Sequence, residues 1–342
     1  MSRVAVVLFN LGGPDGPKAV RPFLKKLFSD PAIIAAPGLV RLGLAELISR
    51  VRERSAIANY AVMGGGSPLT AETAAQAGAL ATHLAGLRPT DEIKVFVAMR
   101  YWNPLAGQTA AEVARFAPDE VVLLPLYPQF STTTTASSLQ AWNALYAGPG
   151  RQHAICCYSD LDGLAEAHAA LIRETWEAAG SPERVRLLFS AHGIPQRISD
   201  SGDPYRWQVE RTCAAVAAKL ERRWDWRIGY QSRVGPMKWL GPSTIEEIER
   251  AGADSVGVII DPIAFVSEHV ETLVELDRDY AELARKVGVS PYLRVPALGV
   301  EPRFIEGLAA LVEQALAAPG LAAGATPCEM GLSRCALRTL AA

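Results

Sequence analysis

Eight short runs rich in valine, isoleucine and leucine recur along the 342-residue chain, and longer amphipathic stretches separate them. Near-continuous apolar strands joined by helices are typical of parallel sheets that are buried on both faces. The pattern therefore predicts an α/β fold with two similar doubly wound domains. The expected strands cover residues 4–11, 94–99, 120–126, 153–157, 185–190, 227–231, 255–260 and 292–295.

The strands fall into two batches of four, and the turn-rich stretch 148–150 lies between them. We therefore expect an N-terminal half at residues 1–148, a C-terminal half at 149–300, a closing helix at 301–318 and a cysteine-containing tail at 319–342. The expected helices cover residues 18–27, 71–84, 110–115, 136–146, 161–179, 205–222, 243–251, 267–286 and 302–316.

Composition narrows the class of protein. Hydrophobic residues make up 49% of the chain and charged residues 20%, which is ordinary for a globular protein. Lys and Arg total 34 against 36 Asp and Glu, and this balance argues against a nucleic-acid partner. The N-terminal stretch lacks the features of a signal peptide, and no apolar run is long enough for a bilayer. We expect a cytoplasmic protein, soluble or peripheral on the inner membrane; its oligomeric state is left open.

Polar and aromatic side chains gather where the expected strands end. Ligands on open α/β sheets bind at the carboxyl ends of the strands. His192 follows an apolar strand within SAHGIP, so it is either a structural histidine or a group that ligates a metal or accepts a proton. Six aromatic residues near strand ends could be core or could face a flat ligand: Tyr101, Trp102, Tyr127, Phe130, Trp239 and Phe265.

The expected helix at 267–286 carries an acidic ladder. Its members recur at helical spacing, with His269 beside the first: Glu268, Glu271, Glu275 and Asp279. One interpretation is a solvated acidic face. The other is a track for a divalent cation or for protons, because one histidine with carboxylates suits iron, manganese or zinc.

Residues 31–49 are more apolar than a buried connection requires, and Arg50, Arg52 and Arg54 follow them. One interpretation is a core-facing helix that ends in solvated arginines. The other is an apolar lip beside a cluster that binds carboxylates, or one that touches a membrane surface. The GGGSP turn at residues 64–68 fits no phosphate-binding fingerprint and reads as a structural turn.

Together these motifs resemble the ferrochelatase family, the enzymes that insert ferrous iron into a porphyrin. The resemblance covers residues 4–316 and rests on NLGGP, YAVMGGGSPL, YPQFSTTTTASSL, LLFSAHGIPQR, YQSRVGPMKWLGPST and PIAFVSEHVETLVELD. It implies two Rossmann-like domains in the chelatase fold, which enclose the porphyrin. It also implies that the helix at 267–286 contains a π-turn that rotates several acids inward.

The resemblance implies roles for particular residues. His192 and Glu271 match the central histidine and glutamate, which are catalytic as iron ligands, proton acceptors or both and face each other across the macrocycle. A path for metal or protons matches Glu268, His269, Glu275 and Asp279. The residues that match porphyrin-binding positions are Leu11, Arg52, Tyr60, Ser67, Arg100, Tyr101, Trp239 and Phe265.

The implied reaction inserts ferrous iron, a substrate, into protoporphyrin IX with release of two protons, the last step of haem synthesis. Coproporphyrin ferrochelatase, cobalt chelatase and a non-enzymatic tetrapyrrole- or solute-binding protein are the alternatives. Some relatives bind a 2Fe–2S cluster through four cysteines. Cys157, Cys328 and Cys335 match three of these ligands, and Leu337 stands where another is expected, so the cluster is left open.

Overall fold

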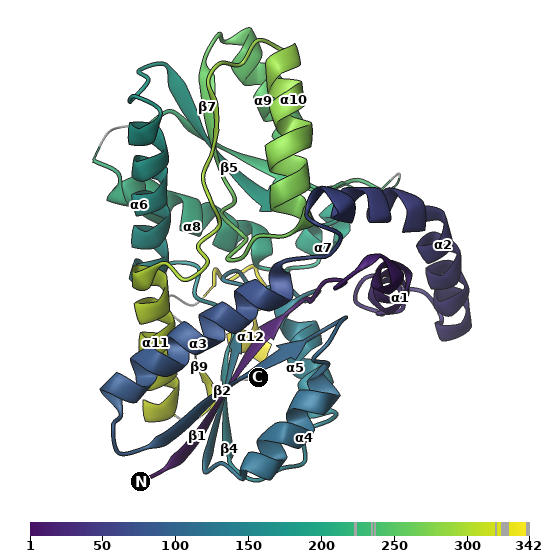
Figure 1. The fold of residues 1–342 in the computed structure, drawn as a ribbon, viewed down its shortest axis with the longest axis vertical. Coiled ribbons are helices and arrows are strands. Elements are labelled where there is room, and N and C mark those ends of the chain that lie inside the picture. Colours follow the sequence, from purple (N-terminus) through teal and green to yellow (C-terminus); the bar gives the residue numbers. More distant parts are fainter. Residues whose placement is uncertain (222–223, 234, 236, 319, 323–327, 340–342) are drawn as a thin grey trace. The chain divides into compact units, whose positions relative to one another are not determined.

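The computed structural model describes residues 1–221, 224–233, 235, 237–318, 320–322 and 328–339 (Figure 1). The chain divides into two compact units, one of residues 1–126 with 132–154 and one of residues 127–131 with 155–342. We describe each unit by itself. The expected separation of a closing helix and a tail as regions of their own stays a prediction, as does the division at residue 148.

The first unit contains four strands that pair in parallel in the order β2-β1-β3-β4. β1 lies inside the sheet, and its residues 4–10 are all buried, as expected for a strand covered on both faces. The elements of this unit are β1 (Arg3–Asn10), α1 (Pro17–Phe28), α2 (Gly38–Val62), α3 (Leu69–Leu87), β2 (Glu92–Met99), α4 (Ala106–Phe116), β3 (Glu120–Pro125), α5 (Thr135–Asn143) and β4 (Arg151–Ile155).

The second unit repeats this architecture with four parallel strands in the order β6-β5-β7-β8. Figure 1 shows α6 on one side of this sheet and α9 and α10 on the other. The elements are α6 (Asp162–Ala178), β5 (Val185–His192), α7 (Gln196–Asp200), α8 (Tyr205–Lys219), β6 (Trp226–Gln231), α9 (Thr244–Ala253), β7 (Gly257–Asp261), η1 (Glu271–Tyr280), α10 (Ala281–Lys286), β8 (Tyr292–Arg294), α11 (Pro302–Ala317), β9 (Gly320–Ala322) and α12 (Ala336–Thr339).

All eight expected strands are confirmed, with ends shifted by a few residues. The expected helix at 205–222 ends earlier in the structure, so that Glu221 lies beyond α8. Arg222 is outside the described residues. The α/β class with two parallel sheets is therefore confirmed. Short helices such as α7 were not expected, because a five-residue segment is too brief to show a helical period.

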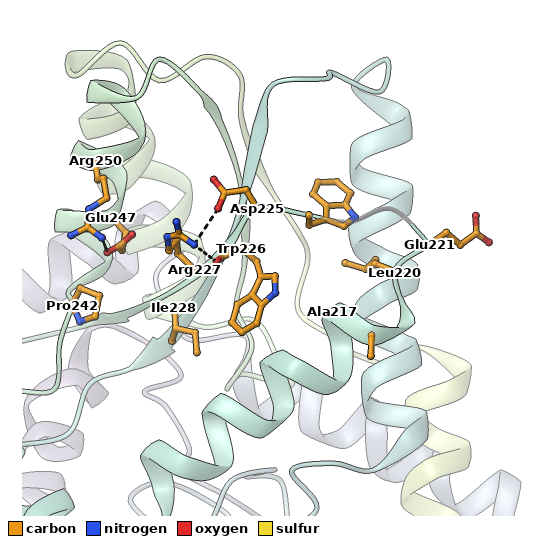
Figure 2. A pocket seen from close by; sticks show the side chains of 12 residues that line it. Ala217, Leu220, Glu221, Asp225, Trp226, Arg227, Ile228, Pro242, Glu247 and Arg250 are labelled. Carbon is orange, nitrogen blue, oxygen red and sulfur yellow. Dashed lines mark hydrogen bonds and ion pairs between the residues drawn. The ribbon is translucent and has the colours of Figure 1, made fainter.

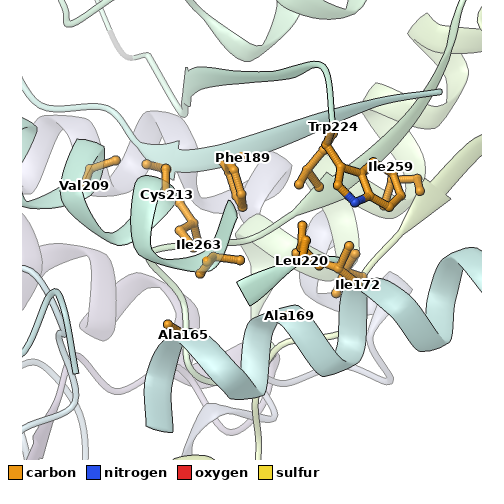
Figure 3. Close-up of a cluster of buried hydrophobic side chains, with 14 of the residues drawn as sticks. Ala165, Ala169, Ile172, Phe189, Val209, Cys213, Leu220, Trp224, Ile259 and Ile263 are labelled. Atoms are coloured by element: carbon orange, nitrogen blue, oxygen red, sulfur yellow. The ribbon is translucent and has the colours of Figure 1, made fainter. Parts of the chain in front are cut away.

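Alternate side chains of β5 contribute to two hydrophobic clusters of the second unit. Leu187 and Phe189 pack with α6 and α8 on one face, where Ile172 and Val209 also lie (Figure 3). Leu188, between them, packs with α9 and α10 on the opposite face. Burial of both faces holds β5 rigidly, and its last residue, His192, leaves the sheet at a defined place.

The acidic stretch of the chain is a π-helix from Glu271 to Tyr280, which continues into α10. The π-turn implied by the family resemblance is thus confirmed. In a π-helix the backbone bonds run from i to i+5, so side chains are spaced differently around the axis than in an α-helix. Thr272, Val274, Leu276 and Tyr280 are buried.

The apolar stretch before the arginines forms the start of α2, and its large side chains are exposed. Leu39, Leu42 and Leu47 have 88%, 50% and 59% of their surface exposed. The core-facing interpretation is therefore wrong for these positions. Arg50 is not simply solvated, because its Nε lies 2.7 Å from Glu46 Oε1. Among the described residues, no helix combines the length and the apolar character that crossing a bilayer requires.

Candidate active site

The carboxyl end of β5 and the start of the π-helix bring one imidazole and one carboxylate into contact. His192 Nδ1 lies 2.9 Å from Glu271 Oε2, across 79 residues of sequence. Tyr205, on α8, donates its hydroxyl to the backbone oxygen of His192 at 3.0 Å. Phe265 stands edge-on to the imidazole, with ring centroids 6.4 Å apart. The His192 side chain keeps 37% of its surface exposed. Its backbone is held by Tyr205, while its imidazole remains accessible.

This contact corrects one expectation. His192 and Glu271 do not face each other across the width of a macrocycle, because a hydrogen-bond distance leaves no room for one between them. Both groups come from the same unit, and each changes the pKa of the other. The direct contact arises because β5 and the π-helix pack within one domain, which spacing along the sequence does not reveal.

The charge of each partner favours the charged form of the other. Burial, the largest influence, lowers the pKa of His192, but attraction to the Glu271 carboxylate outweighs it and raises the pKa above the ordinary value. Burial alone raises the pKa of Glu271, while His192 and then His269 bring it well below its usual range. Because a carboxylate only accepts, Nδ1 carries the shared hydrogen and Nε2 keeps a lone pair in the neutral imidazole.

A second histidine adds to this cluster. His269 Nε2 lies 3.7 Å from Glu271 Oε2, and its Nδ1 lies 3.2 Å from the backbone oxygen of Ser267. The carbonyl can only accept, so Nδ1 donates and Nε2 is turned to the carboxylate. The Phe265 ring packs on His269, with centroids 4.6 Å apart. Glu271 Oε2 therefore lies near two imidazoles.

Glu275 continues the site along the π-helix. Ser232 Oγ and Gln231 Nε2 donate to its Oε2 at 2.7 and 3.2 Å, and Gln231 also donates to the Glu271 backbone oxygen at 2.9 Å. Burial and then the neighbouring Glu271 carboxylate raise the pKa of Glu275 to about 7. A carboxyl group with this pKa can hold or release a proton near neutral pH.

The outer members of the acidic ladder are engaged elsewhere. Glu268 pairs with Arg294 at 2.5 Å and accepts the Ala297 backbone N–H at 2.9 Å. Burial raises the pKa of Glu268, but Arg294 outweighs it, and the pKa falls below the ordinary value. Asp279 is half-exposed beside Arg278, at 2.7 Å. The structure thus brings Glu271, Glu275 and His269 together, and the extension of the path to Glu268 and Asp279 stays a prediction.

The first unit carries a separate polar cluster just beyond β2. Asp30 is buried and accepts three hydrogen bonds at one oxygen: from Arg100 Nη2 at 2.6 Å, from the Tyr101 hydroxyl at 2.8 Å and from Ser137 Oγ at 3.1 Å. Arg100 is half-buried, whereas Tyr101 is 2% exposed. Tyr101 therefore belongs to the packing of this unit and does not offer a ring face to solvent.

The other expected porphyrin positions differ in exposure. Arg52 is exposed on α2 with its guanidinium 5.8 Å from the Phe28 ring centre, and Tyr60 is buried on the same helix. Leu11 and Ser67 are half-buried in the first unit, and Trp239 and Phe265 in the second. Of the six strand-end aromatics, Tyr101, Tyr127 and Phe130 are buried, as the core interpretation expects, while Trp102, Trp239 and Phe265 are half-buried.

The structure brings Cys156, Cys157, Cys328 and Cys335 near one another, but the described residues do not show a 2Fe–2S cluster, and the cluster stays a prediction. Such a cluster needs four ligands, usually thiolates. Cys157 Sγ lies 3.1 Å from Cys156 Sγ, and Gln208 donates to Cys328 Sγ at 3.2 Å. Burial raises the pKa of the Cys328 thiol to about 12. No three or more histidine, cysteine or acidic side chains in the described part of the chain are arranged to hold a metal ion.

Sequence analysis missed three residues that shape the site: Gln231, Ser232 and Tyr205. Gln231 and Ser232 stood in the strand-end motif YQSRVGP, and their position at the carboxyl end of β6 was the available signal. Tyr205 begins α8, and nothing in its local sequence indicated a contact with His192. Gln231 is itself held in place by Ser190 Oγ, which donates a hydrogen bond to Gln231 Oε1 at 2.6 Å.

The fold of the chain resembles that of solved chelatases. It superimposes on SirB from Bacillus subtilis, solved with Fe³⁺, with a TM-score of 0.52, 11% identity and coverage of 92% of this chain and 96% of that one. DR2241 from Deinococcus radiodurans, described as similar to chelatases, gives a TM-score of 0.54 at 14% identity and 91% and 55% coverage.

Sequence comparison then gives the family. The ferrochelatase family model matches residues 3–316. The chain is 62% identical over 339 residues to the ferrochelatase of Caulobacter vibrioides (strain NA1000 / CB15N), and 60% identical over 337 residues to that of Phenylobacterium zucineum, with 98% of both chains covered in each case. The chain belongs to the ferrochelatase family, whose members insert a metal ion into a porphyrin.

Proposed function

We propose that this protein inserts ferrous iron into protoporphyrin IX, a lyase reaction that gives protohaem and releases two protons. Iron and porphyrin are its substrates. The observation that carries the proposal is the contact between His192 Nδ1 and Glu271 Oε2 in a member of the ferrochelatase family. Metal insertion requires a base near the pyrrole nitrogens, and this pair supplies one.

In this mechanism Nε2 of His192 takes a pyrrole proton while Nδ1 keeps its hydrogen bond to Glu271. The carboxylate fixes the tautomer and stabilises the imidazolium that forms, as an acidic partner does for other catalytic histidines. The raised pKa of His192 agrees with this role. The neutral imidazole of His192 and the carboxylate of Glu271 are also suitable ligands for ferrous iron.

Glu275 would receive protons from the inner pair. Its pKa of about 7 makes release to solvent possible at neutral pH, and Ser232 holds its Oε2. His269 also lies near Glu271 Oε2 and would share the incoming charge. Glu268 and Asp279 would form the outer part of the path, where attraction of a cation needs no direct contact.

The decisive experiment compares purified wild type with His192→Ala and Glu271→Gln under anaerobic conditions. Protoporphyrin IX with ferrous iron should yield protohaem in the wild type, measured by its absorption spectrum. Both variants should bind porphyrin, followed by fluorescence quenching, but lose insertion. Near-normal insertion by His192→Ala with porphyrin bound would remove this residue from the reaction.

Two further enzyme activities and one binding function are alternatives. Coproporphyrin III in place of protoporphyrin, and Co²⁺ in place of ferrous iron, should be assayed in parallel, because the inner pair can serve any of these reactions. A tetrapyrrole- or solute-binding protein would bind porphyrin and give no metalated product. The highest kcat/KM among these pairs assigns the physiological substrate.

We propose the porphyrin-binding residues from the family resemblance, and each is described within its own unit. Arg52, exposed on α2, would bind a propionate with a forked hydrogen bond, and Ser67 and Arg100 would add polar contacts. Trp239 and Phe265, both half-buried, would pack against the macrocycle. Leu11 and Tyr60 complete the proposed set, together with Tyr101 as a buried support.

The exposed apolar side chains of α2 support a peripheral contact with the inner face of a membrane, where an apolar porphyrin would be exchanged. Leu39, Leu47 and Val51 would enter the lipid interface. Co-sedimentation with phospholipid vesicles should fall when all three are changed to Ser, while insertion assayed with detergent-dispersed porphyrin stays near the wild-type rate. Equal sedimentation of the variant and the wild type would refute this contact.

A further inference from the structure

A groove in the second unit lies among residues that the proposed reaction does not use. Its volume is about 840 Å³, and it is bordered by the end of α8, the first half of β6 and α9 (Figure 2). Small-molecule sites usually occupy a few hundred to about 1,000 Å³ and combine apolar walls with a few placed polar groups. This groove has both features.

The apolar wall is held in place by ring contacts. Trp226 is half-buried and packs edge-on against Phe189, with ring centroids 5.8 Å apart. Trp224 is buried and packs edge-on against Trp176 at 5.7 Å. Leu220 lies beside them and is also buried. Because the two indoles are fixed by their neighbours, the wall does not have to form when a ligand arrives.

Glu247, on α9, is the unusual member of this groove. Its side chain is 1% exposed, and neither carboxylate oxygen makes a hydrogen bond with a described residue. Arg250 Nη1 forms an ion pair with Oε1 at 2.9 Å, but this contact is not a hydrogen bond. A buried carboxylate without hydrogen bonds is costly, so the native fold retains an unsatisfied acceptor here.

The other charged groups of the groove are better satisfied. Asp225 accepts a hydrogen bond from Arg186 Nε at 2.7 Å and lies 3.2 Å from Arg227 Nη1. Glu221 is exposed, and Figure 2 shows it pointing away from the other lining side chains. Arg250 is 55% exposed at the rim, so it can swing into solvent and leave Glu247 to another cation.

We propose that this groove binds an organic ammonium ion with an apolar body. The ammonium group donates to Glu247, which replaces the imperfect pair with Arg250, and the apolar body packs on Trp226 and Leu220. An ammonium carries three N–H donors and can satisfy both carboxylate oxygens, and an indole face also attracts a cation. The ligand is either a free amine or the lysine side chain of a partner protein, since the chemistry at Glu247 is the same.

The test measures binding of 2-phenylethylamine to the full chain by titration calorimetry, with 2-phenylethanol as the uncharged probe of similar shape. The amine should bind at least about tenfold more tightly than the alcohol, as expected for a hydrogen bond to a charged group. Glu247→Gln should remove this preference. Glu221→Gln, which removes a charge at the same groove, should leave it unchanged.

Arg250→Met supplies a test in the opposite direction. It keeps the aliphatic part of the side chain and removes the competing cation, so the amine should bind several-fold more tightly than to the wild type. A blocked pentapeptide with a central lysine distinguishes the sources: tighter binding than the free amine assigns the groove to a protein partner, and weaker binding assigns it to a small molecule. Thermal unfolding and iron insertion check that each variant is folded.

Three outcomes would overturn the proposal. The first is equal binding of the amine and the alcohol. The second is an unchanged affinity for the amine in Glu247→Gln. The third is the absence of binding at millimolar amine concentration to both the wild type and Arg250→Met.

Discussion

Each of the two units has a carboxylate among polar side chains near the end of a strand, and the two clusters differ in their partners. In the first unit, Asp30 accepts hydrogen bonds from Arg100, Tyr101 and Ser137. In the second, Glu271 contacts His192 and His269. A guanidinium keeps its proton at any physiological pH, whereas an imidazole exchanges one near neutrality. Similar architecture therefore holds a fixed ion pair in one unit and a titratable pair in the other.

The difference extends to the second carboxylate. Asp30 has cationic and neutral donors around it, while Glu271 also has Glu275 nearby, whose pKa its charge helps to raise to about 7. Unlike charges stabilise a site, and like charges make it ready to bind a proton or a cation. Under the proposed function, the first cluster would mainly contribute stability and the second would transfer protons.

The largest effect should follow removal of the base in the second unit. His192→Ala should lower kcat for iron insertion by about 10²- to 10⁴-fold, the usual contribution of a general base. Porphyrin affinity should change only a few-fold, because the imidazole is a small part of the contact surface. Steady-state insertion kinetics and porphyrin titration measure the two quantities. Glu282→Gln is the control, since Glu282 is exposed, pairs with Lys286 and has no proposed role in the reaction.

In the first unit the corresponding change should affect stability. Asp30→Asn leaves the half-buried Arg100 without its carboxylate, and breaking such a pair costs about 3 kcal/mol in unfolding free energy. Denaturant unfolding measures this loss. A drop in kcat as large as that of His192→Ala, with stability unchanged, would contradict the proposed contrast between the clusters.

The pH dependence of stability should distinguish Glu275. Its pKa in the folded state is raised from 4.5 to about 7, so the folded protein binds a proton more tightly than the unfolded chain does. Stability from this group is therefore full below about pH 4.5 and is lost as pH rises through about 7. Glu275→Gln should abolish that loss and raise the unfolding free energy at pH 8 by about 1–3 kcal/mol relative to the wild type.

The measurement for Glu275→Gln is urea unfolding at several pH values between 4.5 and 8. His192 acts in the same direction at higher pH, because its raised pKa makes its contribution fall as pH increases. Glu271 acts in the opposite direction: its lowered pKa contributes stability above pH 4.5 that is lost as pH falls. Parallel curves for wild type and Glu275→Gln would show that Glu275 is ionised normally.

The smallest effect should come from removing the Tyr205 hydroxyl, which donates a hydrogen bond to the His192 backbone oxygen. Tyr205→Phe removes its hydrogen bond to the His192 backbone oxygen and should lower the unfolding free energy by about 1 kcal/mol. Insertion should slow by less than about tenfold, with no shift in the pH profile, because Tyr205 does not exchange the proton. A shifted pH profile would instead place Tyr205 among the groups that titrate in the reaction.

Much of the fold could be predicted because strands depend on local composition. The buried run at β5 and its neighbours are visible as Val, Ile and Leu stretches, and helices between parallel strands follow from chain connectivity. His192 could be placed at a strand end for the same reason. The exposure of Leu39 and Leu47 could not, because a helix with apolar residues around much of its surface gives no preferred face.

The partners of the charged residues could not be predicted from spacing. Glu268 and Glu271 look equivalent in the acidic run, yet Glu268 pairs with Arg294, and Glu271 contacts His192. The unsatisfied Glu247 of the groove has no sequence signal at all, since a glutamate near the start of a helix is ordinary.

The sequence by itself determined the strands, the α/β class and, through its motifs, the family, because these depend on residue pattern along the chain. Only the tertiary structure decided that His192 and Glu271 are in direct contact and that Glu275 lies near them. The physical reason is that electrostatic interactions depend on distance and burial in space, and folding sets both between residues far apart in sequence.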